Sequence, residues 1–235
     1  NSNIDLMKLR ISYGSIGNQG IDPYQTQPLL GRTVYAFGTT PAFGFRPNTI
    51  GNPDLRWESS ATLNIGLDFG LIKGRLSGSM EFYDTRTSSL LAPQPLPNST
   101  GFGGFTTNIG ETQNTGFELT LNSINIDKAN FRWSTDVIFN TNREQIVSLA
   151  NGRVDDIAAG RFIGQPITVF YDLKKVGIWQ TEEADVAQSF GDRPGEIKIE
   201  DFNGDGVINA NDRQILGSAV PDFILGVTNR FNYKA

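Results

Sequence analysis

The sequence has neither cysteine nor histidine among its 235 residues. Without cysteine there is no disulfide framework, no thiolate metal site and no cysteine nucleophile. Without histidine the commonest general base is missing, and so are the usual serine triad and the ordinary zinc site. Carboxylates such as Glu58 and Asp136 have no specific acid–base partner in the sequence, so a β-rich hydrolase is a weak hypothesis and we expect no enzyme.

Long apolar runs, a basic surplus and a signal sequence are missing as well. No run approaches the ~18 apolar residues of a transmembrane helix, so insertion into a membrane would require a β-barrel. The net charge of −5 and the pI near 4.8 argue against nucleic acid as a partner. The chain opens on NSNIDLMKLR and stops at NYKA within an alternating pattern, so we expect an internal fragment.

The most regular feature of the sequence is an apolar alternation with period two over residues 61–83, which predicts a hairpin. A two-residue turn at Lys73-Gly74 would set Ile72 opposite Arg75 and place all the apolar residues on one face. That apolar set is Leu63, Ile65, Leu67, Phe69, Leu76, Met80 and Phe82. The opposite face would carry Asn64, Asp68, Arg75, Ser79 and Glu81.

The length and the charged face of this hairpin suggest a membrane protein. Strands of globular proteins usually have about 5 to 6 residues, whereas a tilted strand that crosses a bilayer needs about 9 to 11. We therefore expect the apolar face to contact lipid and the charged face to line a water-filled lumen, with Lys73-Gly74 in the periplasm. A soluble antiparallel sheet with one wet face is the alternative.

Four further alternating runs predict a first strand over 7–13, a second hairpin over 117–121 and 131–139, and a last strand over 223–233. The connections between the six strands are alternately long and short, as in an outer-membrane barrel with short periplasmic turns and long extracellular loops. Six strands are too few for a closed barrel of this kind, so the predicted fold is all-β, an arc of a large antiparallel transmembrane β-barrel. An aromatic girdle near the loop end would include Tyr13, Trp57, Tyr83 and Phe139.

The long connections are expected to be irregular, apart from a short strand pair at 168–179. Three prolines in the second connection exclude a central strand there. Aromatic residues gather in the first two loops, where we expect packing of loop on loop, with ligand contact as the alternative. These residues are Tyr24, Tyr35, Phe37, Phe43, Phe45, Phe102 and Phe105.

The segment DFNGDGVINAND at 201–212 closely matches a calcium-binding loop. Hard cations need several oxygen donors gathered by a tightly curled backbone, and Gly206 permits the required turn. The proposed ligands are Asp201, Asn203, Asp205, Val207, Asn209 and Asp212. Asp at the twelfth position is shorter than the usual Glu, and the ion would be structural. A metal-free loop held by Asx turns is the alternative.

Several segments, in this order, resemble the C-terminal half of the barrel of SusC-like TonB-dependent outer-membrane transporters. The most specific are NPDLRWE before a strand, the strand NTGFEL and the calcium-loop segment. The others are LMKLRISYGSIGNQGI, ATLNIGLDFGLIKGRLSGSMEFYDTRTSSLL, FRWSTDVIFNTNREQIVSL, GQPITVFYDLKKVGIWQ and PDFILGVTNRFNYK. Residues 1–235 would then form one partial barrel domain, with segment 201–212 in an extracellular loop and the plug domain absent.

The resemblance implies an importer of the Bacteroidota, with a plugged barrel in the outer membrane beneath a SusD-like surface lipoprotein. It implies uptake of oligosaccharides or peptides with energy relayed by TonB through parts missing from this chain, while substrate-contacting residues cannot be assigned. From the residues alone a second hypothesis remains open. It is a secreted, calcium-stabilised β-domain that binds carbohydrate or protein at a cell surface.

Overall fold

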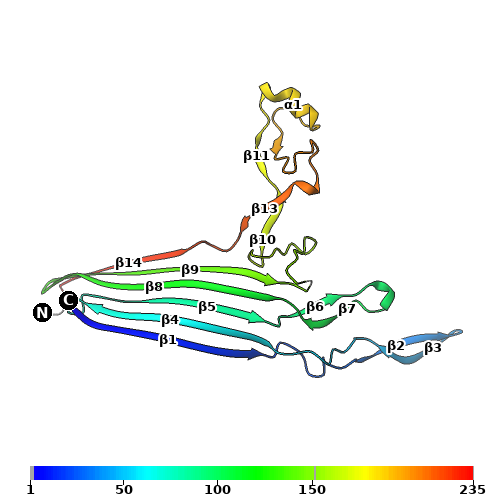
Figure 1. The fold of residues 1–235 in the computed structure, drawn as a ribbon, viewed down its shortest axis with the longest axis horizontal. Coiled ribbons are helices and arrows are strands. Elements are labelled where there is room, and N and C mark those ends of the chain that lie inside the picture. Colours follow the sequence, from blue (N-terminus) through cyan, green and yellow to red (C-terminus); the bar gives the residue numbers. More distant parts are fainter. Residues whose placement is uncertain (1–2, 151, 235) are drawn as a thin grey trace.

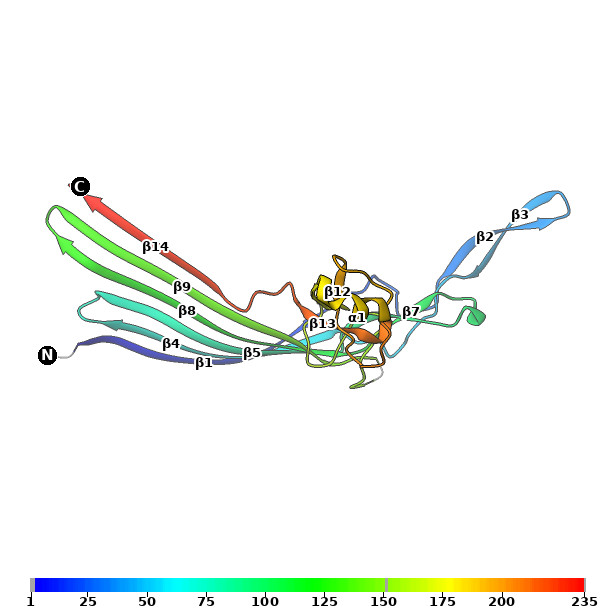
Figure 2. The same ribbon diagram turned by 90° about the horizontal axis from the view of Figure 1, so that it is seen from above.

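The computed structural model describes residues 3–150 and 152–234, so the ends of the expected span 1–235 lie outside the described residues. Six long strands form one antiparallel sheet in the order β1-β4-β5-β8-β9-β14 (Figure 1). They are β1 (Ile4–Asn18), β4 (Glu58–Leu71), β5 (Leu76–Ser88), β8 (Glu111–Lys128), β9 (Phe131–Ser148) and β14 (Ile224–Tyr233). Figure 2 shows that the sheet curves into an arc. Among the described residues β1 and β14 each have one sheet neighbour, so the arc is open.

The hairpin of β4 and β5 forms because its alternation continues through a turn that suits the twist of the strands. Lys73 and Gly74 have φ angles of 57° and 74°, and the Arg75 amide donates to the Ile72 carbonyl at 3.2 Å. Positive φ at both central positions matches a type I′ turn, but Ile72 before them also has a positive φ, of 55°, and the last pair of the ladder is Leu71 with Leu76, so residues 72–75 form the connection. The predicted register is confirmed, since Leu67 lies opposite Met80 and the neighbouring pairs follow in step.

The predicted segregation of short and long connections is also confirmed. The turns at 72–75 and 129–130 lie at one end of the sheet, together with the first residue of β1 and the last residue of β14. The long connections 19–57, 89–110 and 149–223 leave from the other end (Figure 1). We call these the turn end and the loop end.

The first two loops are more regular than the sequence suggested. The first contains a hairpin of β2 (Leu30–Phe37) and β3 (Thr40–Pro47), so the prediction of an irregular segment was wrong there. The second contains β6 (Leu91–Pro95), η1 (Asn98–Thr100) and β7 (Gly104–Asn108). Two of the prolines lie in β6, which belongs to a two-stranded ribbon, where proline does not interrupt a ladder on both sides.

The third loop rises from the sheet as an arm, residues 169–218 (Figure 1). It consists of β10 (Val169–Leu173), β11 (Lys175–Ile178), η2 (Thr181–Glu183), α1 (Ala184–Ser189), β12 (Ile197–Ile199), η3 (Ala210–Asp212) and β13 (Arg213–Ser218). The strands predicted at 168–179 are present, but their pairing with each other was wrong. Only Lys174 separates β10 from β11, so the two strands follow one another in the same direction and cannot pair as a hairpin. Instead, β10 pairs with β13 and β11 pairs with β12.

Buried apolar side chains are few, because an open sheet leaves its apolar face uncovered. Within the described residues they are Phe69, Ile146, Phe162, Trp179 and Ala187. The expected loop-on-loop packing of aromatics was wrong for the first loop, where Phe37, Phe43 and Phe45 are each more than two-thirds exposed. No helix in the described part of the chain is both long and apolar enough to cross a membrane.

Candidate functional site

The register sorts the side chains of the sheet onto two chemically different faces, which are the candidate functional surfaces. One face consists of apolar rows that run across all six strands. Its central row is Leu9, Leu67, Met80, Leu119, Phe139 and Leu225. The predicted apolar set of the first hairpin lies together on this apolar face, and Asn64, Asp68, Ser79 and Glu81 lie on the opposite, polar face. Arg75, predicted with them, lies in the turn outside both strands and donates to the Ile124 and Asn125 carbonyls.

Hydrogen-bonded polar rows bound the apolar face at both ends. Toward the loop end, the Gln113 amide donates to both carboxylate oxygens of Asp84 at 3.0 and 2.9 Å, and Gln145 donates to Gln113 at 2.8 Å. Toward the turn end, Asn125 donates to Thr135 at 2.7 Å, and Thr135 donates to Asn229 at 2.7 Å. The apolar surface is therefore a band of limited height.

Aromatic residues also gather at the turn end of this band, where the sequence did not place them. The Trp133 ring stacks on Phe231 with centroids 5.6 Å apart, and its indole N–H donates to Asn229. Of the four predicted girdle residues, Tyr83 was wrong, because it pairs with Asn64 on the polar face, and Phe139 was wrong, because it lies in the central apolar row and not near the loop end. Tyr13 pairs with Leu63 on the apolar face.

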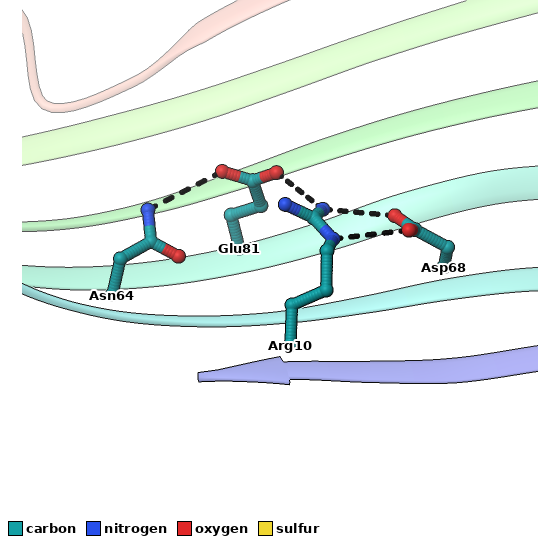
Figure 3. Close-up of polar contacts among 4 residues, drawn as sticks. All are labelled: Arg10, Asn64, Asp68 and Glu81. Atoms are coloured by element: carbon teal, nitrogen blue, oxygen red, sulfur yellow. Dashed lines mark hydrogen bonds and ion pairs between the residues drawn. The ribbon is translucent and has the colours of Figure 1, made fainter. Parts of the chain in front are cut away.

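The polar face carries an ion-pair network that joins three strands (Figure 3). Arg10 on β1 donates to both carboxylate oxygens of Asp68 on β4, from Nε at 3.0 Å and from Nη2 at 2.8 Å. Nη2 also donates to Oε1 of Glu81 on β5 at 2.6 Å, and Asn64 donates to the other Glu81 oxygen at 3.4 Å. Arg10 thereby spans β4, with its guanidinium shared between two acids.

Glycine makes this crossing possible. Arg10, Gly66 and Glu81 form one row of the register, and a Cβ on Gly66 would lie 2.9 Å from Nη2 of Arg10. The same device recurs where Tyr83 crosses a glycine of β8 and donates from its hydroxyl to Asn142 on β9 at 3.2 Å. The crossed residue is Gly116, where a Cβ would collide with the tyrosine ring.

The arm is held by a small core and by ion pairs around it. Trp179, 4% exposed, donates from its indole to Asp192 at 2.9 Å and stacks on Phe190. Lys198 lies 4.4 Å above the Trp179 ring and forms an ion pair with Glu183 at 2.6 Å. This hydrogen bond from Lys198, with one from the Gln180 amide, lowers the pKa of the Glu183 carboxyl.

A second ion pair closes the base of the arm. Lys174, which joins β10 to β11, contacts Glu200 at 3.0 Å, and the Gln214 amide donates to the same carboxylate at 2.7 Å. These two donors, Lys174 first, lower the pKa of Glu200.

The calcium-loop segment is tightly curled around its own carboxylates. Asp201 accepts hydrogen bonds from the Gly204, Asp205 and Gly206 amides at 2.8, 3.2 and 2.8 Å. Asn203 accepts from the Asp205 amide and donates to the Asp205 carboxylate, both at 2.9 Å. These Asx turns tie the side chains at the first, third and fifth positions to the backbone of the loop.

Asp212, at the twelfth position, is fully buried and closes the loop. It accepts from the Asn209 amide at 2.8 Å and from the Phe202 and Asn203 amides at 3.0 and 3.4 Å. These hydrogen bonds, the one from Asn209 first, lower the pKa of the carboxyl although burial opposes the charge. The Asn209 side chain donates to the Val207 carbonyl at 3.1 Å. Among the described residues there is no group of three or more acidic, histidine or cysteine side chains arranged to hold a metal.

A cavity of about 280 Å³ lies at the loop end, between the second and third loops. Its lining is mainly apolar and includes Leu91, Pro93, Ile109, Ile146 and Leu149. Sequence reasoning missed this cavity because its walls come from two loops far apart in the chain.

The sequence and the fold of the chain were compared with those of known proteins, and they match one family. The family model described as TonB dependent receptor-like, beta-barrel matches residues 3–173. TonB-dependent receptor P26 of Formosa agariphila is 33% identical to 97% of this chain, which covers 24% of that protein. TonB-dependent receptor SusC of Bacteroides thetaiotaomicron is 31% identical, again over 97% of this chain and 24% of the relative.

A solved structure of the RagAB peptide importer in the open-open state superposes with a TM-score of 0.76 at 26% identity, covering 100% of this chain and 25% of that one. The chain thus spans about a quarter of the length of these relatives. The chain belongs to the TonB-dependent receptor-like β-barrel family, whose barrels lie in the bacterial outer membrane.

Proposed function

We propose that the chain is part of the barrel wall of a TonB-dependent importer that takes up oligosaccharides or peptides with a SusD-like lipoprotein. The observation that carries the proposal is the division of one curved sheet into an apolar band and a polar face. A soluble protein would leave that band as an exposed apolar patch, whereas a bilayer covers it. This division favours the importer over a secreted β-domain.

On this proposal the apolar face contacts lipid and the polar face lines the lumen, with the turn end in the periplasm. Polar rows such as Asp84 with Gln113 then lie at the level of the head groups, and Trp133 lies in the opposite interface, where indole rings are favoured. The loop end, with the arm and the β2–β3 hairpin, faces the outside, where a lipoprotein partner would bind.

The polar face suits passage of a hydrogen-bonding solute. Its network is occupied by structural ion pairs, and no residue of the chain is a histidine or cysteine that could act as base or nucleophile. One solved relative is named a peptide importer, which supports peptides, and the resemblance to SusC-like transporters keeps oligosaccharides in the proposal.

The experiment is an uptake assay in the source bacterium. The gene that encodes the full-length protein is deleted, and import of labelled oligosaccharides and labelled peptides is measured with and without complementation, in cells with and without TonB. We expect one substrate class to lose uptake in the deletion strain and to need TonB for its recovery. Unchanged uptake of both classes would contradict the proposal.

We also propose that loop 201–212 binds a structural Ca²⁺ through the six positions named from the sequence. The Asp201, Asn203 and Asp205 side chains support this because the oxygens of all three accept hydrogen bonds from amides of the same tight curl. Binding at all six requires the Asn209 amide to release the Val207 carbonyl and Asp212 to turn one oxygen away from the backbone.

Limited proteolysis of the full-length protein tests the calcium proposal. Chelation should speed cleavage within the loop, and added Ca²⁺ should reverse the effect. The variant Asp205→Asn should weaken the protection, whereas Asp54→Asn in the first loop should not. Equal cleavage rates with chelator and with Ca²⁺ would count against a bound ion.

A further inference from the structure

The cavity of about 280 Å³ at the loop end has its floor on the polar face of the sheet. Thr112 on β8 and Ile146 on β9 form this floor and lie opposite each other in the register. Thr112 also aligns with Thr87 on β5, in a row of the polar face. Both floor residues are buried, with 7% and 2% of their surface exposed. The cavity therefore lies on the side of the sheet that lines the proposed lumen, at the end from which the long loops leave.

The walls of the cavity come from the second and third loops and are mainly apolar. Leu91 and Pro93 are supplied by β6. Ile109 lies just before β8, and Leu149 lies just after β9. Among the described residues the lining contains no aromatic ring. Its polar side chains are Gln94, Thr112, Ser148, Asp156 and Arg161.

Thr112 is the only one of these polar side chains that is more than nine-tenths buried. Within residues 3–150 and 152–234 its hydroxyl has no hydrogen-bond partner, whereas the neighbouring Thr87 hydroxyl bonds to that of Ser60 at 2.8 Å. No fully enclosed side-chain oxygen in the described part of the chain lacks a partner, so the Thr112 oxygen is reached from the cavity. A buried hydroxyl without a partner is unfavourable, and Thr112 is therefore ready to bind a polar atom that enters the cavity.

The size and the lining of the cavity fit a group with an apolar body and one polar tip. An apolar cavity of about 150 Å³ already binds a ring the size of benzene, so this larger cavity has room for an aromatic side chain. A tyrosine side chain buries its ring favourably and carries a single hydroxyl. A sugar ring carries several hydroxyls, each of which would need a partner against mainly apolar walls. Asp156 and Arg161 are paired by backbone hydrogen bonds of 2.8 and 2.9 Å, so their opposite charges lie together and favour neither an anion nor a cation.

We propose that this cavity binds a tyrosine side chain of an imported peptide, with the phenol hydroxyl hydrogen-bonded to Oγ1 of Thr112. The inference rests on the proposed import function and names peptides as its substrate class. The apolar walls contact the ring, and the rest of the peptide lies over the polar face, where the solute passes. A lipid acyl chain does not compete for the cavity, because the proposed lipid contact is on the opposite face of the sheet.

Native mass spectrometry of the purified full-length protein with glycine pentapeptides tests the site. The peptides are offered as an equimolar pool and differ only at the central residue, which is tyrosine, phenylalanine or serine. Wild type should retain the tyrosine peptide about 10- to 100-fold more than the serine peptide and about 2- to 10-fold more than the phenylalanine peptide. Thr112→Val should abolish the advantage of tyrosine over phenylalanine and keep that of phenylalanine over serine. Leu149→Asp should abolish both, whereas the matched control Leu30→Asp, at an exposed position of the first loop, should change neither.

Equal retention of the tyrosine and serine peptides, or retention of none, would overturn the proposal. A tyrosine advantage that survives Thr112→Val, or equal losses in Leu149→Asp and Leu30→Asp, would overturn it as well. If Leu149→Asp does not assemble, Thr112→Val still decides, because valine has nearly the shape of threonine. Uptake of oligosaccharides alone in the deletion experiment, together with no peptide binding here, would leave the import proposal standing and remove only the assignment of the cavity.

Discussion

Leu119→Arg and Thr120→Arg place the same charge on opposite faces of one strand at the same height. Leu119 lies in the central apolar row, between Met80 and Phe139, and Thr120 lies on the polar face. On β8 the band runs between Thr115 and Ser123, eight residues apart by numbering, or about 27 Å along the strand. At a tilt near 40° this is about 21 Å along the membrane normal, and Leu119 is its midpoint.

An arginine at the midplane of a barrel's lipid face costs about 2 to 4 kcal/mol, whereas a lumen substitution costs far less. This corresponds to a drop of about 30- to 700-fold in the folding equilibrium for Leu119→Arg. The assay is a urea titration of the full-length protein in vesicles, with the folded fraction read from its resistance to SDS. Thr120→Arg is the control, expected close to wild type. Equal midpoints for the two variants, or a larger loss for Thr120→Arg, would refute the assignment of faces.

Three further predictions concern the polar face and the arm. Gly66→Val should displace Arg10 and cost about 1 to 3 kcal/mol in the same titration, and a variant as stable as wild type would show that the crossing is dispensable. Tyr83→Phe should lower the free energy of unfolding by about 1 kcal/mol, because it removes one hydrogen bond. In a protein that already carries Gly116→Leu, Tyr83→Phe should lower it no further, because the leucine side chain has already displaced the ring. The pKa of the Asp212 carboxyl is lower in the folded arm than in the unfolded chain. The ionised carboxylate therefore stabilises the folded arm fully above about pH 4, and this stabilisation is lost as the pH falls through the pKa of the folded state. The protease should therefore cleave the loop of the Asp212→Asn variant faster than that of wild type at neutral pH. A wild-type loop that is equally resistant at pH 3 and pH 7 would contradict the stabilising role of the ionised carboxylate.

The sheet could be predicted because its information is local. A period-two pattern and a two-residue turn fix which residues face each other, and a slip of one residue would turn every side chain to the wrong face. The placement of Tyr83 in a girdle was an avoidable mistake. It shares its parity on β5 with Ser79 and Glu81, so the alternation already assigned it to the polar face.

The loops could not be predicted in the same way, because their contacts are distant in sequence. β10 pairs with β13 about forty residues later, and no local pattern in 169–173 names that partner. The calcium-loop motif was visible because its oxygen donors lie within twelve consecutive residues.

Glycine explains how a polar wall can be both charged and rigid. A side chain such as Arg10 reaches past its neighbour to the second strand only if the residue between carries no side chain, and Gly66 satisfies this condition. The crossing ties the carboxylates of Asp68 and Glu81 to one shared cation, so the wall gains a fixed cross-link that carries a net negative charge. Because the cross-link spans three strands, it resists a slip in either adjacent register. The glycines of these strands, which weaken a strand when considered alone, therefore stabilise the alignment of the sheet.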